Sequence, residues 1–201
     1  MAELYYFRDI GRGEAIRIAL DLSGISYVEK TIMPVDWLAF KEQGMKDGTL
    51  PFGQLPLLKI DGMNLVESSS ILRYLSAKYI SPDADLKMAT TIDIMVEGWN
   101  DVISGYSAHL FNDPCALYSW IHKECDVLLS RLEAVYSRNN TAYFVSDDVT
   151  VVDCIAIAAI ENLSIDYPEV LLQHPVLTKY MGIVINHPSI KRSLMKRQSS
   201  N

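Results

Sequence analysis

The chain has 201 residues, of which 49% are hydrophobic and 21% are charged, and its formal net charge is −7. These values are ordinary for a globular protein with a proper core, arranged as one large or two small domains. The acidic balance argues against nucleic acid as the main partner, because nucleic acid favours a basic surface.

The first part of the chain alternates strand and helix signals. Apolar residues recur at helical spacing from Ala15 to Leu22, and Gly24 supplies a stop. Asp61 and Gly62 favour a tight hairpin turn. We therefore predict a small sheet covered by helices. The expected order is a strand over 3–7, a turn over 11–13, a helix over 15–22, a strand over 27–32, an irregular segment over 34–48, a hairpin of 57–60 with 63–66, and a helix over 68–79.

The pair Leu55-Pro56 precedes the hairpin and predicts a cis peptide bond at the start of a strand, since proline cannot donate inside a sheet. We expect the backbone of Leu55 to be available to an extended peptide, as in strand addition. Glu67-Ser68 opens the next helix, whose first amides attract a carboxylate. A backbone clamp beside an anion site suits a small acidic peptide.

The second part of the chain carries only helical signals beyond Ser81-Pro82-Asp83, which we predict to be the domain boundary. Thr150 and Asp153 have the spacing of a capping box, with Asp153 in a structural role. The expected domains are an α/β domain over 1–79, a linker over 80–85 and an all-α domain over 86–201. Helices are predicted over 87–110, 118–136, 151–163 and 176–185.

The spacing of the cysteines and the length of the apolar runs argue against a metal site, a signal peptide and a membrane-spanning segment. Cys115, Cys125 and Cys154 form neither a C-x-x-C pair nor a metal-ligand pattern, and we expect them to be buried in helices. Glu3 and Asp9 interrupt any signal peptide, and no apolar run is long enough to span a bilayer. The sequence predicts a cytoplasmic protein without a metal and without membrane association.

Two polar patterns allow more than one interpretation. Gly11-Arg12-Gly13 could begin a dinucleotide fingerprint, but Ile16 stands where the third glycine is needed, so that hypothesis fails. Asp93, Glu97 and Asp101 recur every four residues on one helix face. Like charges at this spacing repel, so the face needs either solvent or a partner.

Six motifs follow one another along the chain, over residues 4–7, 11–17, 36–37, 51–56, 67–75 and 150–153. In this order they resemble the tyrosine-type cytosolic glutathione transferases, most closely the sigma class with the pi class as neighbour, and the resemblance covers essentially the whole chain. It implies a thioredoxin-like βαβαββα domain followed by an all-helical domain, in a homodimer. Ile10 departs from the family, since many relatives carry arginine there, and Glu67 replaces a common glutamine.

The resemblance implies a detoxifying transferase that activates the glutathione thiol as a thiolate and conjugates it to small hydrophobic electrophiles. A free thiol with a pKa of about 8.5 is only a few per cent thiolate at neutral pH, so a donor aimed at the sulfur is needed. The family register gives this catalytic role to Tyr6 and an assisting positive charge to Arg12. Strand alternation alone cannot choose between Tyr5 and Tyr6.

The family register also assigns residues to each part of glutathione. Glu67 and Ser68 would hold the γ-glutamyl end, and Asp101 would reach the neighbouring subunit's ligand. The central and glycyl parts would contact Trp37, Lys41, Gln54, Leu55 and Pro56. The electrophile site would use Phe7, Arg8, Ile103 and Tyr106. Each of these residues also has a structural interpretation, such as core aromatic, helix cap or solvated charge.

Other functions of the same fold stay open. A glutathione-binding carrier or structural protein would keep the ligand without turnover. A prostaglandin isomerase of the sigma type is less favoured, because that enzyme has a tryptophan shortly after this tyrosine, whereas Ala108 and His109 stand in that region here. Phe52 could insert between subunits as a hydrophobic key, and the sequence does not name the physiological electrophile.

Overall fold

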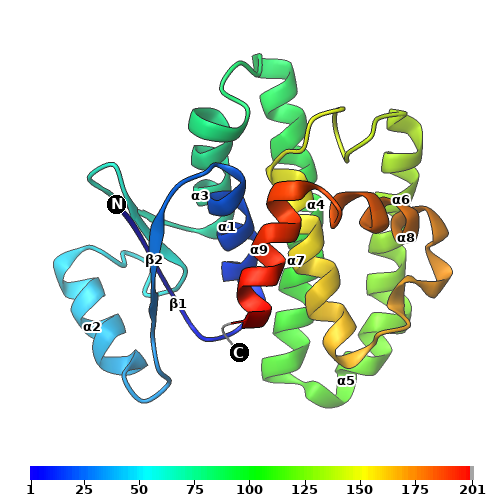
Figure 1. Ribbon diagram of the computed structural model, residues 1–201. Coiled ribbons are helices and arrows are strands. Elements are labelled where there is room, and N and C mark those ends of the chain that lie inside the picture. Colours follow the sequence, from blue (N-terminus) through cyan, green and yellow to red (C-terminus); the bar gives the residue numbers. More distant parts are fainter. Residues whose placement is uncertain (200–201) are drawn as a thin grey trace.

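The computed structural model describes the backbone of residues 1–199 and the side chains of residues 1–196. Residues 200–201, at the end of the range expected for the second domain, lie outside the described residues. A sheet with its helices forms one side of the molecule and a set of helices forms the other (Figure 1). We place the division between the two parts in the segment 81–85, which joins η1 to α4.

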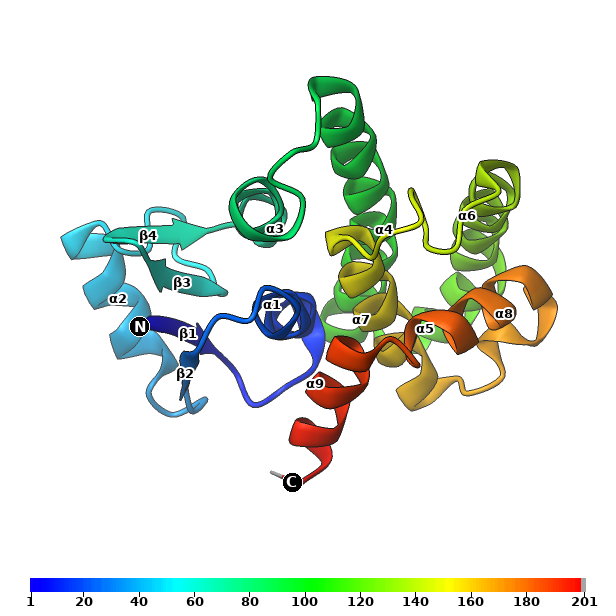
Figure 2. The ribbon, with the colours of Figure 1, turned by 45° about the horizontal axis from the view of Figure 1, so that its top comes forward.

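A four-stranded sheet in the order β2-β1-β3-β4 organises the N-terminal part. β1 pairs in parallel with β2, and the β1–β3 and β3–β4 pairs are antiparallel. Helices α1 and α3 lie on the side of the sheet that faces the other helices, and α2 lies on the opposite side (Figure 2). The bounds are β1 (Ala2–Tyr6), α1 (Gly11–Leu22), β2 (Tyr27–Thr31), α2 (Trp37–Asp47), β3 (Leu57–Ile60), β4 (Met63–Val66), α3 (Ser68–Leu75) and η1 (Ser76–Ile80).

Two local predictions in this part are wrong. The segment 34–48 is not irregular, since it holds the whole of α2, which ends at Gly48 with φ +82°. Because Gly44 is the one residue of α2 that is buried, the helix shows no apolar period from which it could be found. The predicted turn over 11–13 is instead the first turn of α1.

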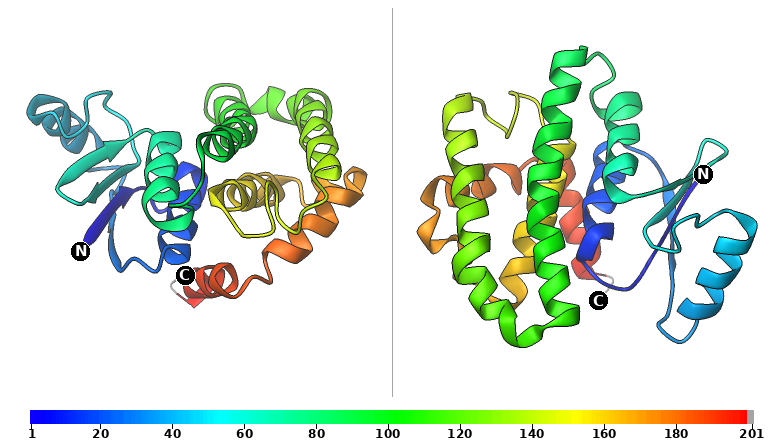
Figure 3. Two further views of the ribbon diagram at one scale, coloured as in Figure 1. Left: turned by 90° about the horizontal axis from the view of Figure 1, so that it is seen from above. Right: turned by 180° about the vertical axis from the view of Figure 1, so that it is seen from behind.

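The C-terminal part contains helices joined by loops and no strand among the residues that the structure describes. Its centre is α7, where every residue from Val151 to Ile160 is buried between α1, α4 and the later helices (Figure 3). The basic tail with Lys191, Arg192, Lys196 and Arg197 predicts a solvated helix end. The structure has the helix α9 there, and this helix packs against α1. The bounds are α4 (Leu86–Asn112), α5 (Pro114–Trp120), η2 (Ile121–Cys125), α6 (Asp126–Asn139), α7 (Val151–Asp166), η3 (Val170–Gln173), α8 (Pro175–Val184) and α9 (Pro188–Ser199).

The capping box at the start of α7 is confirmed and is part of a larger buried network. Asp153 is fully buried, and its Oδ2 accepts the backbone N–H of Thr150 at 2.7 Å. Its Oδ1 accepts the N–H of Phe144 at 3.0 Å and the hydroxyl of Tyr180 at 2.7 Å. The Thr150 hydroxyl oxygen accepts the N–H of Val152 at 3.3 Å. This carboxylate joins the loop before α7 to α8.

Within the described residues, none of the helices has the length and hydropathy that crossing a membrane requires.

Candidate functional site

Tyr6 is the last residue of β1, and its ring lies beneath the start of α1. Only 8% of the residue is exposed, and its hydroxyl oxygen accepts the backbone N–H of Arg12 at 2.9 Å. Burial raises the pKa of the phenol, and the amide of Arg12 opposes this effect. The group is therefore a neutral phenol at neutral pH. Because the oxygen accepts an amide, the phenol proton stays available for a second partner.

Two glycines allow α1 to approach this ring. A Cβ on Gly11 would lie 2.4 Å from the Tyr6 hydroxyl oxygen, and one on Gly13 would lie 2.4 Å from Cδ1 of the ring. Gly11 also has φ +39°, a region that side chains disfavour. The motif Gly11-Arg12-Gly13 therefore marks a close contact between α1 and Tyr6.

The side chain of Arg12 turns away from Tyr6 toward the helical part. Its Nη1 donates to Oδ1 of Asn100 at 3.2 Å, and its Nη2 donates to the Ser104 hydroxyl at 2.9 Å. Both partners belong to α4. Arg12 therefore supports the phenol through its backbone and links the two parts of the protein through its guanidinium.

Trp37 and Lys41, on consecutive turns of α2, lie near the residue after Tyr6. The Phe7 ring packs edge-on against Trp37, with 5.3 Å between the ring centroids. The Lys41 ammonium lies 6.0 Å from the centre of the Trp37 ring. Both α2 residues are half-buried, so the tryptophan is not a core residue and its neighbour is not fully solvated.

The segment from Gln54 to Ser68 contains the other residues assigned to glutathione. The Leu55-Pro56 bond is cis, as predicted, and Leu55 lies just before the β1–β3 pairing, which ends at the Tyr5–Leu57 pair. Gln54 is exposed. Ser68 is 7% exposed and is the first residue of α3.

Glu67 has a backbone conformation that no sequence motif predicts. Its φ of +64° is left-handed, and its side chain makes no capping hydrogen bond to α3. Such a conformation costs about 1–3 kcal/mol in a non-glycine residue and is common at ligand sites. The strain is directly beside the predicted anion site.

The acidic face of α4 is partly used inside the chain. Asp93 forms a salt bridge with Arg73 of α3, with 2.9 Å between the charged atoms. Oε2 of Glu97 accepts the Asn100 amide at 3.4 Å. Asp101 is exposed. Of the three carboxylates, Asp101 is the one on which the proposal of an intersubunit contact depends.

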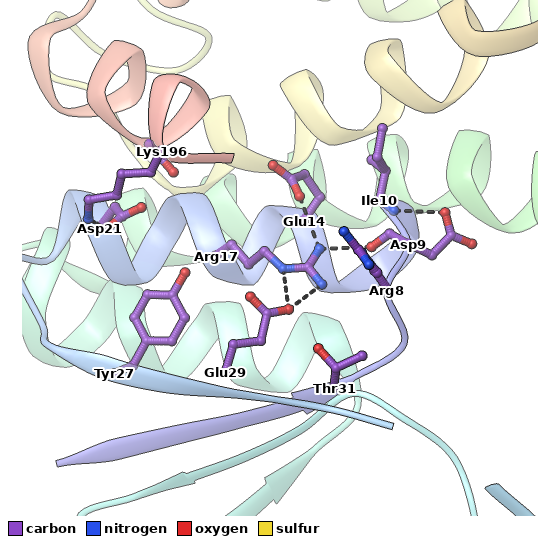
Figure 4. Close-up of a pocket in the computed structure, with 11 residues that line it drawn as sticks. Arg8, Asp9, Ile10, Glu14, Arg17, Asp21, Tyr27, Glu29, Thr31 and Lys196 are labelled. Carbon is purple, nitrogen blue, oxygen red and sulfur yellow. Dashed lines mark hydrogen bonds and ion pairs between the residues drawn. The ribbon is translucent and has the colours of Figure 1, made fainter. Parts of the chain in front are cut away.

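The four residues expected at the electrophile site are not gathered around one described cavity. Ile103 and Tyr106 are buried in α4, at 2% and 4% exposure. The Tyr106 hydroxyl donates to Asp166 of α7 at 2.5 Å, and burial together with Asp166 raises the pKa of that phenol. Phe7 packs on α2, as described above. Arg8 is exposed and lines a different cavity, between α1, β2 and α9 (Figure 4).

The cysteines differ from one another in exposure. Cys125 and Cys154 are buried as predicted, but Cys115 is exposed in the first turn of α5, where the prediction is wrong. Burial raises the pKa of Cys125 to about 12. Among the side chains described, no group of three or more His, Cys, Asp or Glu residues is arranged to hold a metal.

Comparisons with known proteins give matches of the same kind for both parts of the chain. Residues 4–83 match the family model "Glutathione S-transferase, N-terminal domain", and residues 100–197 match "Glutathione S-transferase, C-terminal domain". Mouse (Mus musculus) "Glutathione S-transferase A4" is 32% identical over 203 residues, which cover 96% of this chain and 87% of the mouse protein.

Solved structures give the same fold. A pi-class glutathione S-transferase of Onchocerca volvulus has a TM-score of 0.87 at 25% identity, covering 99% of this chain and 94% of that one. A structure titled "rat hPGDS complexed with a quinoline" has a TM-score of 0.82 at 26% identity, covering 98% of this chain and 96% of the other. The thioredoxin-like sheet followed by helices is therefore confirmed. The names of the relatives span more than one class.

Proposed function

Because the chain belongs to the glutathione S-transferase family, we propose that it holds the glutathione thiol as a thiolate and transfers it to small hydrophobic electrophiles. The observation that carries the proposal is Tyr6, a buried neutral phenol whose oxygen already accepts the Arg12 amide. Its proton can be donated to a sulfur. A hydrogen bond to the anionic sulfur favours the ionised form and lowers the thiol pKa. Each unit of that shift corresponds to about 1.4 kcal/mol.

The reaction needs no further redox or metal chemistry. The thiol proton leaves to solvent, and the thiolate sulfur attacks an electrophilic carbon to form a carbon–sulfur bond. With an aryl halide, the halide then departs with the bonding electrons. Tyr6 donates a hydrogen bond throughout and is not consumed.

We assign the peptide contacts by the register of the family. Ser68 and the first amides of α3 would bind the γ-glutamyl carboxylate, with Glu67 near its ammonium. Leu55 would pair through its backbone with the cysteinyl unit, beside Pro56 and Gln54. Trp37 and Lys41 would donate to the glycyl carboxylate. Half-burial of both α2 side chains beside Phe7 supports this assignment.

A homodimer is part of the proposal. Phe52 is 65% exposed, so its ring is accessible to a partner subunit, as a hydrophobic key requires. Asp101 is also exposed and would reach the ammonium of the partner's glutathione. A cytoplasmic location and a role in detoxification rest on the family alone.

The electrophile would meet apolar surface from Ile103 and Tyr106, with Phe7 and Arg8 at the border. Since the Tyr106 hydroxyl donates to Asp166, we propose that Tyr106 contributes ring surface and no proton to the electrophile.

Conjugation of glutathione to a generic aryl halide tests the proposal. We expect Tyr6→Phe to lower kcat by roughly 10²–10³-fold, as for loss of one donor to a developing anion. Tyr5→Phe is the matched control, because the Tyr5 hydroxyl donates to Glu3 on the same strand and its ring stacks on Phe40. A protein that binds glutathione without turnover would support the carrier alternative instead.

Similarity to the rat hPGDS structure favours one second candidate, a glutathione-dependent prostaglandin isomerase. Product analysis after incubation with a prostaglandin endoperoxide tests it, because an isomerase forms the rearranged product and returns glutathione unconsumed. Consumption of glutathione without rearranged product would exclude this candidate.

A further inference from the structure

Arg17, one turn beyond the close contact of α1 with Tyr6, is a largely but not fully buried cation that the proposed mechanism does not use. Its side chain is 12% exposed and forms part of the wall of a cavity of about 530 Å³ between α1, β2 and α9. Figure 4 shows it extending from α1 toward Glu29 on β2 and toward Asp9 in the loop after β1.

The guanidinium makes as many hydrogen bonds as it has N–H groups. Nε and Nη2 donate to Oε1 of Glu29 at 2.8 and 2.6 Å. Nη1 donates to Oε2 of Glu14 at 3.0 Å and to the backbone carbonyl of Asp9 at 2.8 Å. Nη2 also donates to the backbone carbonyl of Phe7 at 3.2 Å. Two of the five bonds therefore hold main-chain carbonyls.

Those two carbonyls belong to the segment that links Tyr6 to α1. The segment begins directly after Tyr6 and leads to Arg12, whose N–H binds the Tyr6 oxygen. A shift of the Phe7 or Asp9 carbonyl would therefore change the position of the Arg12 amide relative to the phenol. The guanidinium carbon is also 5.6 Å from the centre of the Tyr6 ring.

Stability alone is a weak reason for such an arrangement. Glu14 is only 1% exposed, so both members of the Arg17–Glu14 pair have lost most of their hydration. Burial disfavours the charged guanidinium, but Glu29 and Glu14 outweigh it and raise the pKa of Arg17. Buried ion pairs can often be replaced by apolar residues without loss of stability. An apolar pair at positions 14 and 17 could not bind the backbone carbonyls of Phe7 and Asp9.

We infer that Arg17 is a positioning residue for Tyr6, which keeps the Arg12 amide on the phenol oxygen by holding the carbonyls of Phe7 and Asp9. This inference rests on the proposed activation of the glutathione thiol. A lysine at position 17 keeps the charge opposite Glu14, but its single ammonium cannot reach both carbonyls and both carboxylates.

The apparent pKa of the bound glutathione thiol measures this role directly. The ultraviolet absorbance of the thiolate is recorded against pH for the wild-type protein and for Arg17→Lys, together with the Kd for glutathione. We expect Arg17→Lys to raise the apparent thiol pKa by about one unit, which means an acid dissociation constant about tenfold smaller. The Kd should change far less, because Arg17 is not among the proposed glutathione contacts.

Asp21→Asn is the matched control. Asp21 lines the same cavity from the same helix, and its carboxylate binds Lys196 of α9 at 2.5 Å, away from the loop. This variant should keep the wild-type thiol pKa. If Arg17→Lys does not fold, the double variant Glu14→Gln, Arg17→Gln removes both buried charges and is expected to show the same rise.

The results distinguish the role of Arg17 from the proposed activation of the glutathione thiol. A wild-type protein that lowers the thiol pKa, with Arg17→Lys unchanged, would overturn the role of Arg17 and leave the proposed function intact. An equal rise of the thiol pKa in Arg17→Lys and Asp21→Asn would also overturn it, because the effect would then be a nonspecific loss of structure around the cavity. A wild-type protein that binds glutathione at its ordinary thiol pKa would overturn the proposed thiol activation, and the inference with it.

Discussion

Replacing Gly13 with alanine should displace the Tyr6 ring with a single methyl group. The new Cβ would lie 2.4 Å from Cδ1, 2.7 Å from Cγ and 2.9 Å from Cε1 of that ring, whereas ordinary contacts of a Cβ begin at 3.4 Å. The ring must therefore move by about 1 Å, because its near edge is rigid and not the end of a flexible chain.

Such a displacement predicts a loss of activity larger than the loss of stability. Overpacking should cost about 1–3 kcal/mol of the free energy of unfolding. A misplacement of about 1 Å can lower a catalytic rate about 10²-fold. The assays are kcat for conjugation of glutathione to an aryl halide, and urea unfolding followed by circular dichroism.

Gly182 offers a control for the substitution itself. It lies inside α8, and an added Cβ would meet nothing within 4 Å. Gly182→Ala should therefore leave kcat unchanged and stabilise the protein by about 0.5–1 kcal/mol. Wild-type kcat in Gly13→Ala would refute the reasoning, because it would mean that the position of the Tyr6 ring does not matter for turnover.

Three further predictions concern buried polar groups and thiols. Asp153→Ala removes the acceptor of the Phe144 and Thr150 amides and of the Tyr180 and Thr150 hydroxyls. At about 1–3 kcal/mol for each buried donor left unpaired, it should lower the free energy of unfolding by at least about 3 kcal/mol in urea titrations. A loss under about 1 kcal/mol would contradict the network. A thiol reagent should modify Cys115 alone in the native protein and all three cysteines after unfolding. The raised pKa of Cys125 keeps this thiol protonated in the folded state while the unfolded chain ionises, so the free energy of unfolding should fall as pH rises above about 9. Native modification of Cys125, or stability independent of pH in this range, would contradict its burial.

Signals that act over a few residues predicted the structure well. The hairpin turn at Asp61 and Gly62 has φ +53° and +76°, as the preference of this pair for left-handed backbone implies. The capping box at Thr150 and Asp153 is likewise a contact between residues three positions apart. Neither requires knowledge of the rest of the fold.

Apolar periodicity does not predict helices that lack a buried apolar stripe. α2 is mostly exposed, and α9 is strongly polar over residues 188–199. The resemblance to the family implied α2, and the basic tail indicated a helix end, but neither predicted the bounds of α9 or its packing. Its contact with α1 is tertiary, and Lys196 reaches Asp21 across 175 residues of sequence.

The sequence motifs propose residues for the candidate site, but they do not predict the contacts that these residues make. Alternation along β1 could not separate Tyr5 from Tyr6, and the structure directs the Tyr5 hydroxyl to Glu3 and the Tyr6 oxygen to the Arg12 amide. Asp166, which holds the Tyr106 hydroxyl, lies 60 residues further along the chain and follows no motif. Such partners depend on how the helices pack, which short motifs do not encode.

A crystal structure with bound glutathione tests the central claim most directly. We predict one tripeptide in each subunit, with its sulfur within hydrogen-bond distance of the Tyr6 hydroxyl while the Arg12 amide stays on the same oxygen. A sulfur far from Tyr6, with the phenol proton directed to a protein group, would contradict the account.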